Sequence, residues 1–193
     1  VWIGPLFETH ISDFFVQTRF KAKTITVIDI PGLQLHRVVD GQLDAHLWLN
    51  SSNGVRIAKA IAERAAEMDP VNATSYRQNL EKFSVEIETR NQQIAQKFQA
   101  PPVTNYAVYH NAYQYFEQQF GLRHDMVILQ DPEVQPSIRE TIKQRSQVND
   151  QRPSCLLLEF DSSLDLVSTV LNGHELKQIT VDLLGSNLSS SGN

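Results

Sequence analysis

The sequence contains one cysteine, no cluster of basic residues and no long apolar run. Cys155 stands alone among 193 residues, so the chain cannot close an internal disulfide, and composition leaves its redox compartment open. No apolar stretch approaches the roughly 20 residues that a helix needs to cross a bilayer, and we predict no membrane-spanning segment. The net charge of -5 and the lack of a Lys/Arg run argue against a nucleic acid partner, because phosphate binding normally uses a clustered basic face.

The motifs of common enzymes are missing as well. The sequence has no Walker phosphate loop, no G-x-S-x-G turn and no C-x-x-C pair. We therefore predict that the chain is not an ordinary enzyme. Its 41% hydrophobic and 20% charged residues are typical of a folded globular protein. A chain of this length buries about 70% of its unfolded surface, which is enough for one large domain or two small lobes.

Both ends of the chain suggest truncation. Val1 is neither an initiator Met nor the start of a charged and then apolar leader, so processing or truncation is expected. The apolar run of residues 1–3 is broken at once by Gly4-Pro5, which favours entry near the end of a buried strand. Residues 186–193 have almost no apolar side chains and are expected to be disordered or an artificial stop.

The first half of the sequence predicts one strand and two helices. Residues 24–30 are rich in β-branched side chains, which favours a short buried strand. After the N-cap candidates Asn50 and Ser51, apolar residues recur every three or four positions, which predicts an amphipathic helix that stops before Pro70. A second apolar stripe restarts at Pro70 and continues to Pro101-Pro102. This second helix, roughly 40 Å long, could serve as a rigid spine.

The second half alternates between strand-like and helical patterns. Strands are predicted at residues 106–109, 126–129, 155–158 and 178–181, and helices at residues 112–120, 136–147 and 163–171. Strands that alternate with helices indicate a mostly parallel sheet covered on both faces. The predicted fold class is therefore α/β.

Two histidines occupy positions where ligands are often bound. His46 lies in D-A-H-L-W-L, a connection just before a predicted helix cap, and such connections commonly carry binding residues. His110 follows the predicted strand at residues 106–109, and parallel α/β sheets bind ligands at the carboxyl ends of their strands. Zinc accepts neutral imidazole nitrogens at about 2.0–2.1 Å, so the pair would suit this metal. An ordinary surface histidine is the alternative interpretation of His46.

Carboxylates could complete such a site, because zinc needs three or four protein ligands. Glu159 and Asp182 each follow a predicted strand, but a solvated salt bridge for Glu159 and a helix N-cap for Asp182 are equally open. Tyr113 belongs to an aromatic cluster that could line a pocket or simply pack in the core. The remaining histidines have no comparable placement and stay unassigned: His10, His36, His124 and His174.

Several short motifs follow one another along nearly the whole chain. They are V-W-I-G-P at residues 1–5, D-A-H-L-W-L at 44–49, Y-H-N-A-Y-Q-Y-F at 109–116, F-G-L at 120–122, D-P-E-V-Q-P at 131–136 and V-D-L-L-G at 181–185. Together they resemble the ZnuA-like periplasmic zinc-binding components of high-affinity zinc ABC importers. The second and third motifs are similar to metal-ligand segments of that family. The ordered set carries the resemblance, because no single motif is decisive.

The resemblance implies two lobes of mostly parallel sheet with flanking helices, joined by one long spine helix. Residues 1–69 would belong to the N-terminal lobe, 70–100 to the linking helix and 101–193 to the C-terminal lobe. The protein would be a periplasmic monomer that captures Zn²⁺ and delivers it to the membrane permease of an ABC transporter. His46, His110 and Asp182 are the expected metal ligands, with Glu159 and Tyr113 as residues behind them that orient the ligands. Manganese-type relatives tend to carry a carboxylate at the position of His110, which favours zinc.

Some features depart from the family pattern. The family's first metal-binding histidine lies upstream of the first motif, and its closing helix follows the last one, so neither falls within this chain. The prolines usual after the acids at positions 159 and 182 are replaced by Phe160 and Leu183, and a His-rich loop is missing. The resemblance also implies that Cys155 matches a cysteine that pairs near the C-terminus in related members. We therefore expect weaker zinc binding than in a complete family member.

Two other functions stay open from the sequence. The missing ligand and prolines could mark a paralogue or fragment that keeps the fold, has lost metal binding and acts as an interaction module. A zinc hydrolase, ranked last, would need an open coordination position and a general base, for which Glu159 is the only candidate. The leading hypothesis predicts that ring nitrogens of His46 and His110 lie within about 5 Å of each other, with Asp182 beside the same cleft.

Overall fold

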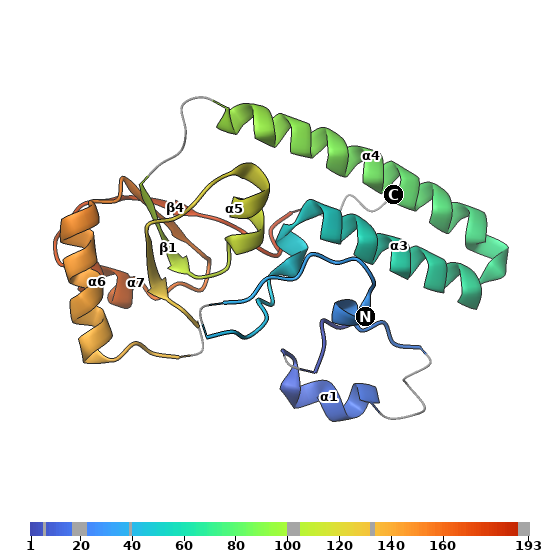
Figure 1. Ribbon diagram of the computed structural model, residues 1–193, viewed down its shortest axis with the longest axis horizontal. Helices are drawn as coiled ribbons and strands as arrows, with labels where there is room; N and C mark the ends of the chain where they lie inside the picture. The colour runs from blue at the N-terminus through green and yellow to red at the C-terminus, as the bar shows by residue number, and fades with distance from the viewer. Residues whose placement is uncertain (6, 17–22, 39, 100–104, 132–133, 189–193) are drawn as a thin grey trace. The chain divides into compact units, whose positions relative to one another are not determined.

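The computed structural model describes residues 1–5, 7–16, 23–38, 40–99, 105–131 and 134–188. The chain divides into two compact units: unit 1 is Val1–Ala100 and unit 2 is Pro101–Asn193. Unit 1 is mainly helical, and unit 2 contains a parallel sheet with helices on it (Figure 1). None of the helices in the described ranges is long and apolar enough to cross a membrane.

Two packed helices dominate unit 1. α3 (Ser51–Met68) and α4 (Ala73–Phe98) lie side by side, joined by the short 3-10 helix η3 (Pro70–Asn72) (Figure 1). Asn50 caps α3, because its side chain accepts a hydrogen bond from the backbone N–H of Asn53. Both predicted helices are therefore confirmed. The predicted stop at Pro101-Pro102 lies outside the described residues, and α4 ends at Phe98 before it.

The beginning of unit 1 differs from the prediction. Besides α1 (Thr9–Val16), it contains the 3-10 helix η1 (Val27–Asp29) where residues 24–30 were predicted to form a strand. Thr26 pairs with Trp2 only in an isolated parallel bridge. β-branched residues favour an extended backbone where neighbouring strands supply a ladder of hydrogen bonds, and in this described part of unit 1 the pairing is limited to that bridge. The strand prediction was therefore wrong, because its sequence signal depended on partners.

Unit 2 is built on a parallel four-stranded sheet in the order β2-β1-β3-β4. The strands are β1 (Tyr106–His110), β2 (Met126–Leu129), β3 (Cys155–Leu158) and β4 (Lys177–Thr180), with α5 (Gln114–Phe120), α6 (Ile138–Gln151) and α7 (Leu164–Leu171) between them. Every predicted strand and helix of this half is present, with bounds that shift by a few residues. The α/β fold class is confirmed.

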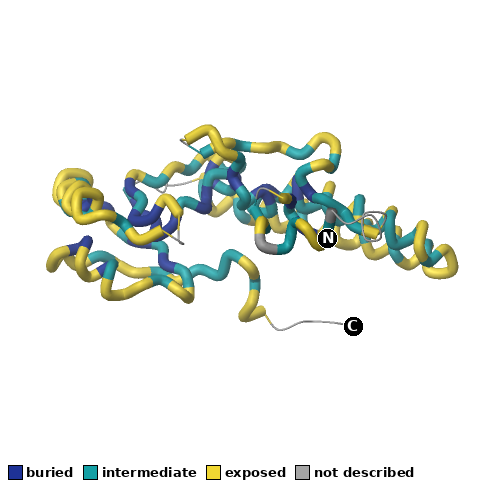
Figure 2. The backbone as a smooth tube through the Cα atoms, turned by 90° about the horizontal axis from the view of Figure 1, so that it is seen from below, coloured by how far each residue is buried: buried dark blue, intermediate teal, exposed yellow. Residues whose placement is uncertain are grey.

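The core of unit 2 lies on both faces of this sheet. On one face, side chains of β1, β2 and β3 pack against α6 and α7, with Ala107 and Leu156 among the buried residues of the central strands. Tyr106, Val108, Ala112 and Tyr113 form a second cluster on the other face, next to α5. Figure 2 colours the backbone by burial, with buried residues in dark blue. The two clusters hold the central strands β1 and β3 in place, so their carboxyl ends lie at the same end of the sheet.

Candidate metal-binding site

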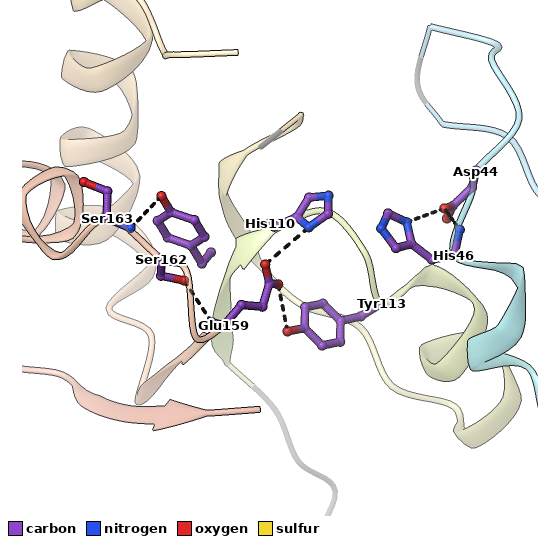
Figure 3. A network of polar contacts seen from close by, with 8 residues as sticks. Asp44, His46, His110, Tyr113, Glu159, Ser162 and Ser163 are labelled. Carbon is purple, nitrogen blue, oxygen red and sulfur yellow. Dashed lines mark hydrogen bonds and ion pairs between the residues drawn. The ribbon is translucent and has the colours of Figure 1, made fainter. Parts of the chain in front are cut away.

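Strand register places His110 beside Glu159. β1 and β3 are parallel neighbours in which Tyr106 is level with Cys155 and Val108 with Leu157. Side chains alternate between the two faces of a strand. His110 and Glu159 come two residues after Val108 and Leu157, so they are expected to lie level with each other on the same face. The structure places His110 Nδ1 3.4 Å from Glu159 Oε2, with both side chains about one-tenth exposed (Figure 3). A buried imidazole and a largely buried carboxylate thus meet at the carboxyl end of the sheet.

Tyr113 holds the other oxygen of the same carboxylate. The Tyr113 hydroxyl donates a hydrogen bond to Glu159 Oε1 over 3.2 Å, so Glu159 lies between Tyr113 and His110 (Figure 3). Burial, followed by the nearby charge of Glu159, raises the pKa of Tyr113, which therefore stays a neutral donor. The backbone N–H of Glu159 donates to Ser162 Oγ, which anchors the start of this loop. The orientation of Glu159 is fixed at both ends.

His46 forms a separate histidine–carboxylate pair in unit 1. His46 Nδ1 lies 2.8 Å from Asp44 Oδ1, which also accepts the backbone N–H of His46 (Figure 3). The D-x-H spacing lets one carboxylate bind the backbone and the ring of the same residue. His46 itself precedes the 3-10 helix η2 (Leu47–Leu49), which leads directly to the cap of α3. Its position is therefore tied to a rigid element.

Asn53 fastens this connection to α3. Its side chain is fully buried: Oδ1 accepts the N–H of Gln34, and Nδ2 donates to the carbonyl oxygens of Gln34 and Leu47. Leu47 directly follows His46 in the sequence and is also buried. One amide side chain thus satisfies backbone groups of two loop segments, which holds the His46 loop against the first turn of α3.

Asp182 has a different set of contacts. It follows β4 at the carboxyl end of the sheet. Its carboxylate accepts hydrogen bonds from the backbone N–H groups of Leu184 and Asn187 and from the hydroxyl of Ser186. Hydrogen bonds from Asn187 and Ser186 hold the pKa of Asp182 below its usual range despite the cost of desolvation. All these contacts lie within residues 182–187, and none of the described contacts of Asp182 reaches His110. Its role as a ligand stays a prediction.

The two histidine pairs share a chemical feature of metal-binding histidines. Such histidines usually have one ring nitrogen hydrogen-bonded to a carboxylate or carbonyl, which orients the ring and leaves the other nitrogen as the ligand. In both His46 and His110 a carboxylate approaches Nδ1, so Nε2 would be the coordinating atom. Within the described ranges, no group of three or more His, Cys, Asp or Glu residues is close enough to hold a metal ion. The predicted approach of His46 to His110 stays a prediction, since the two residues belong to different units.

A third histidine–carboxylate pair lies at the amino ends of the strands. Glu117 of α5 is buried, and its Oε1 accepts the Nδ1–H and the backbone N–H of His124 and the hydroxyl of Tyr106. Burial raises the pKa of Glu117, but the hydrogen bonds from His124 and Tyr106 outweigh it, so the pKa is lowered. The pKa of Tyr106 is raised by burial and by Glu117. This cluster is an ionised carboxylate held by directional donors.

The lowered pKa of Glu117 predicts acid sensitivity. Its contribution to stability is fully present above the ordinary glutamate pKa of 4.5 and is lost as the pH falls through the lower pKa of the folded state. Urea unfolding of the wild type should therefore show decreasing stability below pH 4.5, and Glu117→Gln should flatten that part of the curve. Glu140→Gln is a control, because Glu140 also has a lowered pKa but is exposed in the α6 capping box. Equal pH slopes for the wild type and Glu117→Gln would contradict the prediction.

Three of these residues, Asp44, Glu117 and His124, were given no role from the sequence. Asp44 was quoted only as part of a motif, although its D-x-H spacing to His46 was a usable signal. Glu117 and His124 gave no such signal, because their meeting depends on how α5 folds back over the sheet. Glu159 and Tyr113, predicted to orient the ligands, do contact one another, and Glu159 contacts His110.

Comparisons with known proteins converge on one family. A family model described as zinc-uptake complex component A, periplasmic (ZnuA) matches residues 1–193. The high-affinity zinc uptake system protein ZnuA of Brucella abortus is 28% identical over 148 residues, which are 77% of this chain and 44% of that protein. The chain therefore spans less than half the length of this relative.

Solved structures show the same fold. A zinc-bound variant of AdcAII from Streptococcus pneumoniae superposes with a TM-score of 0.77 at 20% identity, covering 98% of this chain and 72% of that one. The substrate-binding protein FpvC of Pseudomonas aeruginosa, in complex with Mn²⁺, gives a TM-score of 0.73 at 18% identity, covering 92% of this chain and 66% of that one. At these identities the likeness establishes the fold. It does not identify the metal, which has to be inferred from the donor atoms of the site.

Proposed function

The chain belongs to the ZnuA family of zinc-uptake components, and on that premise we propose that it binds Zn²⁺ as cargo for an ABC importer. ZnuA proteins are substrate-binding proteins and not enzymes. In this proposal the protein works in the periplasm as a monomer and passes the ion to a membrane permease. The single observation that carries it is the buried His110–Glu159–Tyr113 arrangement at the carboxyl end of the sheet.

We assign His46 and His110 as the ligands, each through Nε2. Asp44 and Glu159 would accept from Nδ1 and orient the rings, and Tyr113 would keep Glu159 in place. Imidazole nitrogen donors suit zinc better than manganese, which prefers carboxylate and other oxygen ligands. Asp182 is proposed as a third ligand, and its coordination would require it to give up contacts within its own turn. Water would complete the shell.

Isothermal titration of this chain with Zn²⁺ and with Mn²⁺ tests the proposal. We expect one zinc ion per chain and weaker binding of manganese, because the ligands are imidazoles. Zinc affinity should fall as the pH is lowered, since protons compete with the metal for the same ring nitrogens. The absence of zinc binding by a folded chain at neutral pH would favour the alternative of a fold-retaining interaction module. Equal affinity for both metals would contradict the assignment to zinc.

A further inference from the structure

We propose that Glu117, together with its donors Tyr106 and His124, is a positioning residue for His110. This inference rests on the proposed function, because it assigns His110 as a ligand. Glu117 is not a ligand itself and lies at the amino ends of the strands, while His110 lies at the carboxyl end of β1. The connection between them runs through α5 and Tyr113.

A continuous series of contacts links the two sites. His124 Nδ1 lies 2.8 Å from Glu117 Oε1, and the backbone N–H of Glu117 donates to the carbonyl of Tyr113 over 2.9 Å. The hydroxyl of Tyr113 binds Glu159 Oε1, and Glu159 Oε2 approaches His110 Nδ1. Every link lies within unit 2 and joins buried or nearly buried groups. Rotation of α5 would therefore move Tyr113 and change the orientation of Glu159.

The short length of α5 makes its position depend on such contacts. α5 contains only seven residues, and isolated helices of that length are not stable in water. Burial of Tyr115 supplies apolar packing, but apolar contacts are not directional. The hydrogen bonds from Tyr106 and His124 to Glu117 are directional. They connect α5 to β1 through Tyr106 and to the loop before β2 through His124. Glu117 is thus the group that sets the rotation of α5 and the place of Tyr113.

A double-mutant cycle on the whole chain tests this link. Glu117→Gln keeps the shape of the side chain and removes its charge, and Tyr113→Phe removes the hydroxyl that binds Glu159. We expect each variant to weaken zinc binding about tenfold, at the low end for residues that orient a metal ligand. Because both act through Glu159, the double variant should lose little more than either single variant. Independent, multiplicative losses would overturn the proposal.

Two controls separate positioning from general destabilisation. Ser137→Ala removes the capping box of α6, a site in unit 2 outside the proposed series, and should leave zinc affinity unchanged. His124→Phe keeps an aromatic ring against Tyr106 and the backbone N–H bond to Glu117 but removes the ring donor, so it should also weaken zinc binding. It replaces Glu117→Gln in the test if that variant does not fold. Normal zinc affinity in a folded Glu117→Gln or His124→Phe chain would refute the role.

A readout without metal distinguishes this proposal from the proposed function. The ¹⁵N shifts of the His110 ring report which nitrogen carries the proton, and contact with Glu159 favours the Nδ1–H form. Glu117→Gln and Tyr113→Phe should move these shifts toward those of a mixture of tautomers, whereas Ser137→Ala should not. If wild-type protein binds no zinc but the shifts respond as stated, the proposed function fails and the positioning network stands. If zinc binds and the shifts do not respond, the network alone is wrong.

Discussion

Replacing His110 with alanine should weaken zinc binding by at least about 100-fold, more than the loss of a residue that only orients a ligand. The substitution removes one of the two proposed imidazole donors and leaves the largely buried Glu159 carboxylate without the ring beside it. His46→Ala should have an effect of the same order, because it removes the other donor. Competition with a chelator of known zinc affinity measures both losses on one scale.

A matched control for these variants is His174→Ala. His174 is exposed and follows the turn at residues 172–173; its Nε2 contacts Asn149, and it has no place in the proposed site. This variant should bind zinc as the wild type does, which would exclude a general effect of histidine number. If His46→Ala and His110→Ala both retain wild-type affinity, the ligand assignment is wrong. If only His110→Ala loses binding, the site belongs to unit 2 alone.

Replacing Asn53 with alanine should lower the free energy of unfolding by about 2–4 kcal/mol, since it removes three hydrogen bonds of a fully buried side chain, each of which contributes about 0.5–1.5 kcal/mol. The variant removes the side-chain partner of the N–H and the carbonyl of Gln34, and one of the two donors to the carbonyl of Leu47, which also accepts the Asn50 N–H. Urea unfolding followed by circular dichroism measures the loss. Because the released segment includes the residue after His46, zinc affinity should fall as well.

Asn79→Ala is the matched control for Asn53→Ala. Asn79 lies on the exposed face of α4, where alanine has the higher helix propensity, so stability should change by no more than about 0.5 kcal/mol. A similar small effect for Asn53→Ala would show that water replaces the amide at this site. In that case Asn53 would not be the group that holds the His46 loop.

The sequence predicted the secondary structure of unit 2 well because the signals there are local. β2 and β3 coincide with the predicted apolar runs at residues 126–129 and 155–158, which are bounded by polar or turn-forming residues. α7 (Leu164–Leu171) matches the predicted helix at residues 163–171 except that Ser163 is its cap, and it ends at Asn172 in a left-handed conformation. Residues 24–30 failed for the opposite reason, since a strand signal has no effect where a continuous partner ladder does not form.

What the sequence determined by itself was the α/β class, the order of elements and the identity of the candidate donors, because periodicity, caps and ordered motifs are local properties. The tertiary structure decided which of these groups meet. Parallel register brought Glu159 level with His110, and the return of α5 over the sheet brought Glu117 to His124. Asp182 followed the same sequence rule as Glu159, yet its carboxylate binds its own turn. Contacts between residues remote in sequence depend on register and packing, which no local pattern encodes.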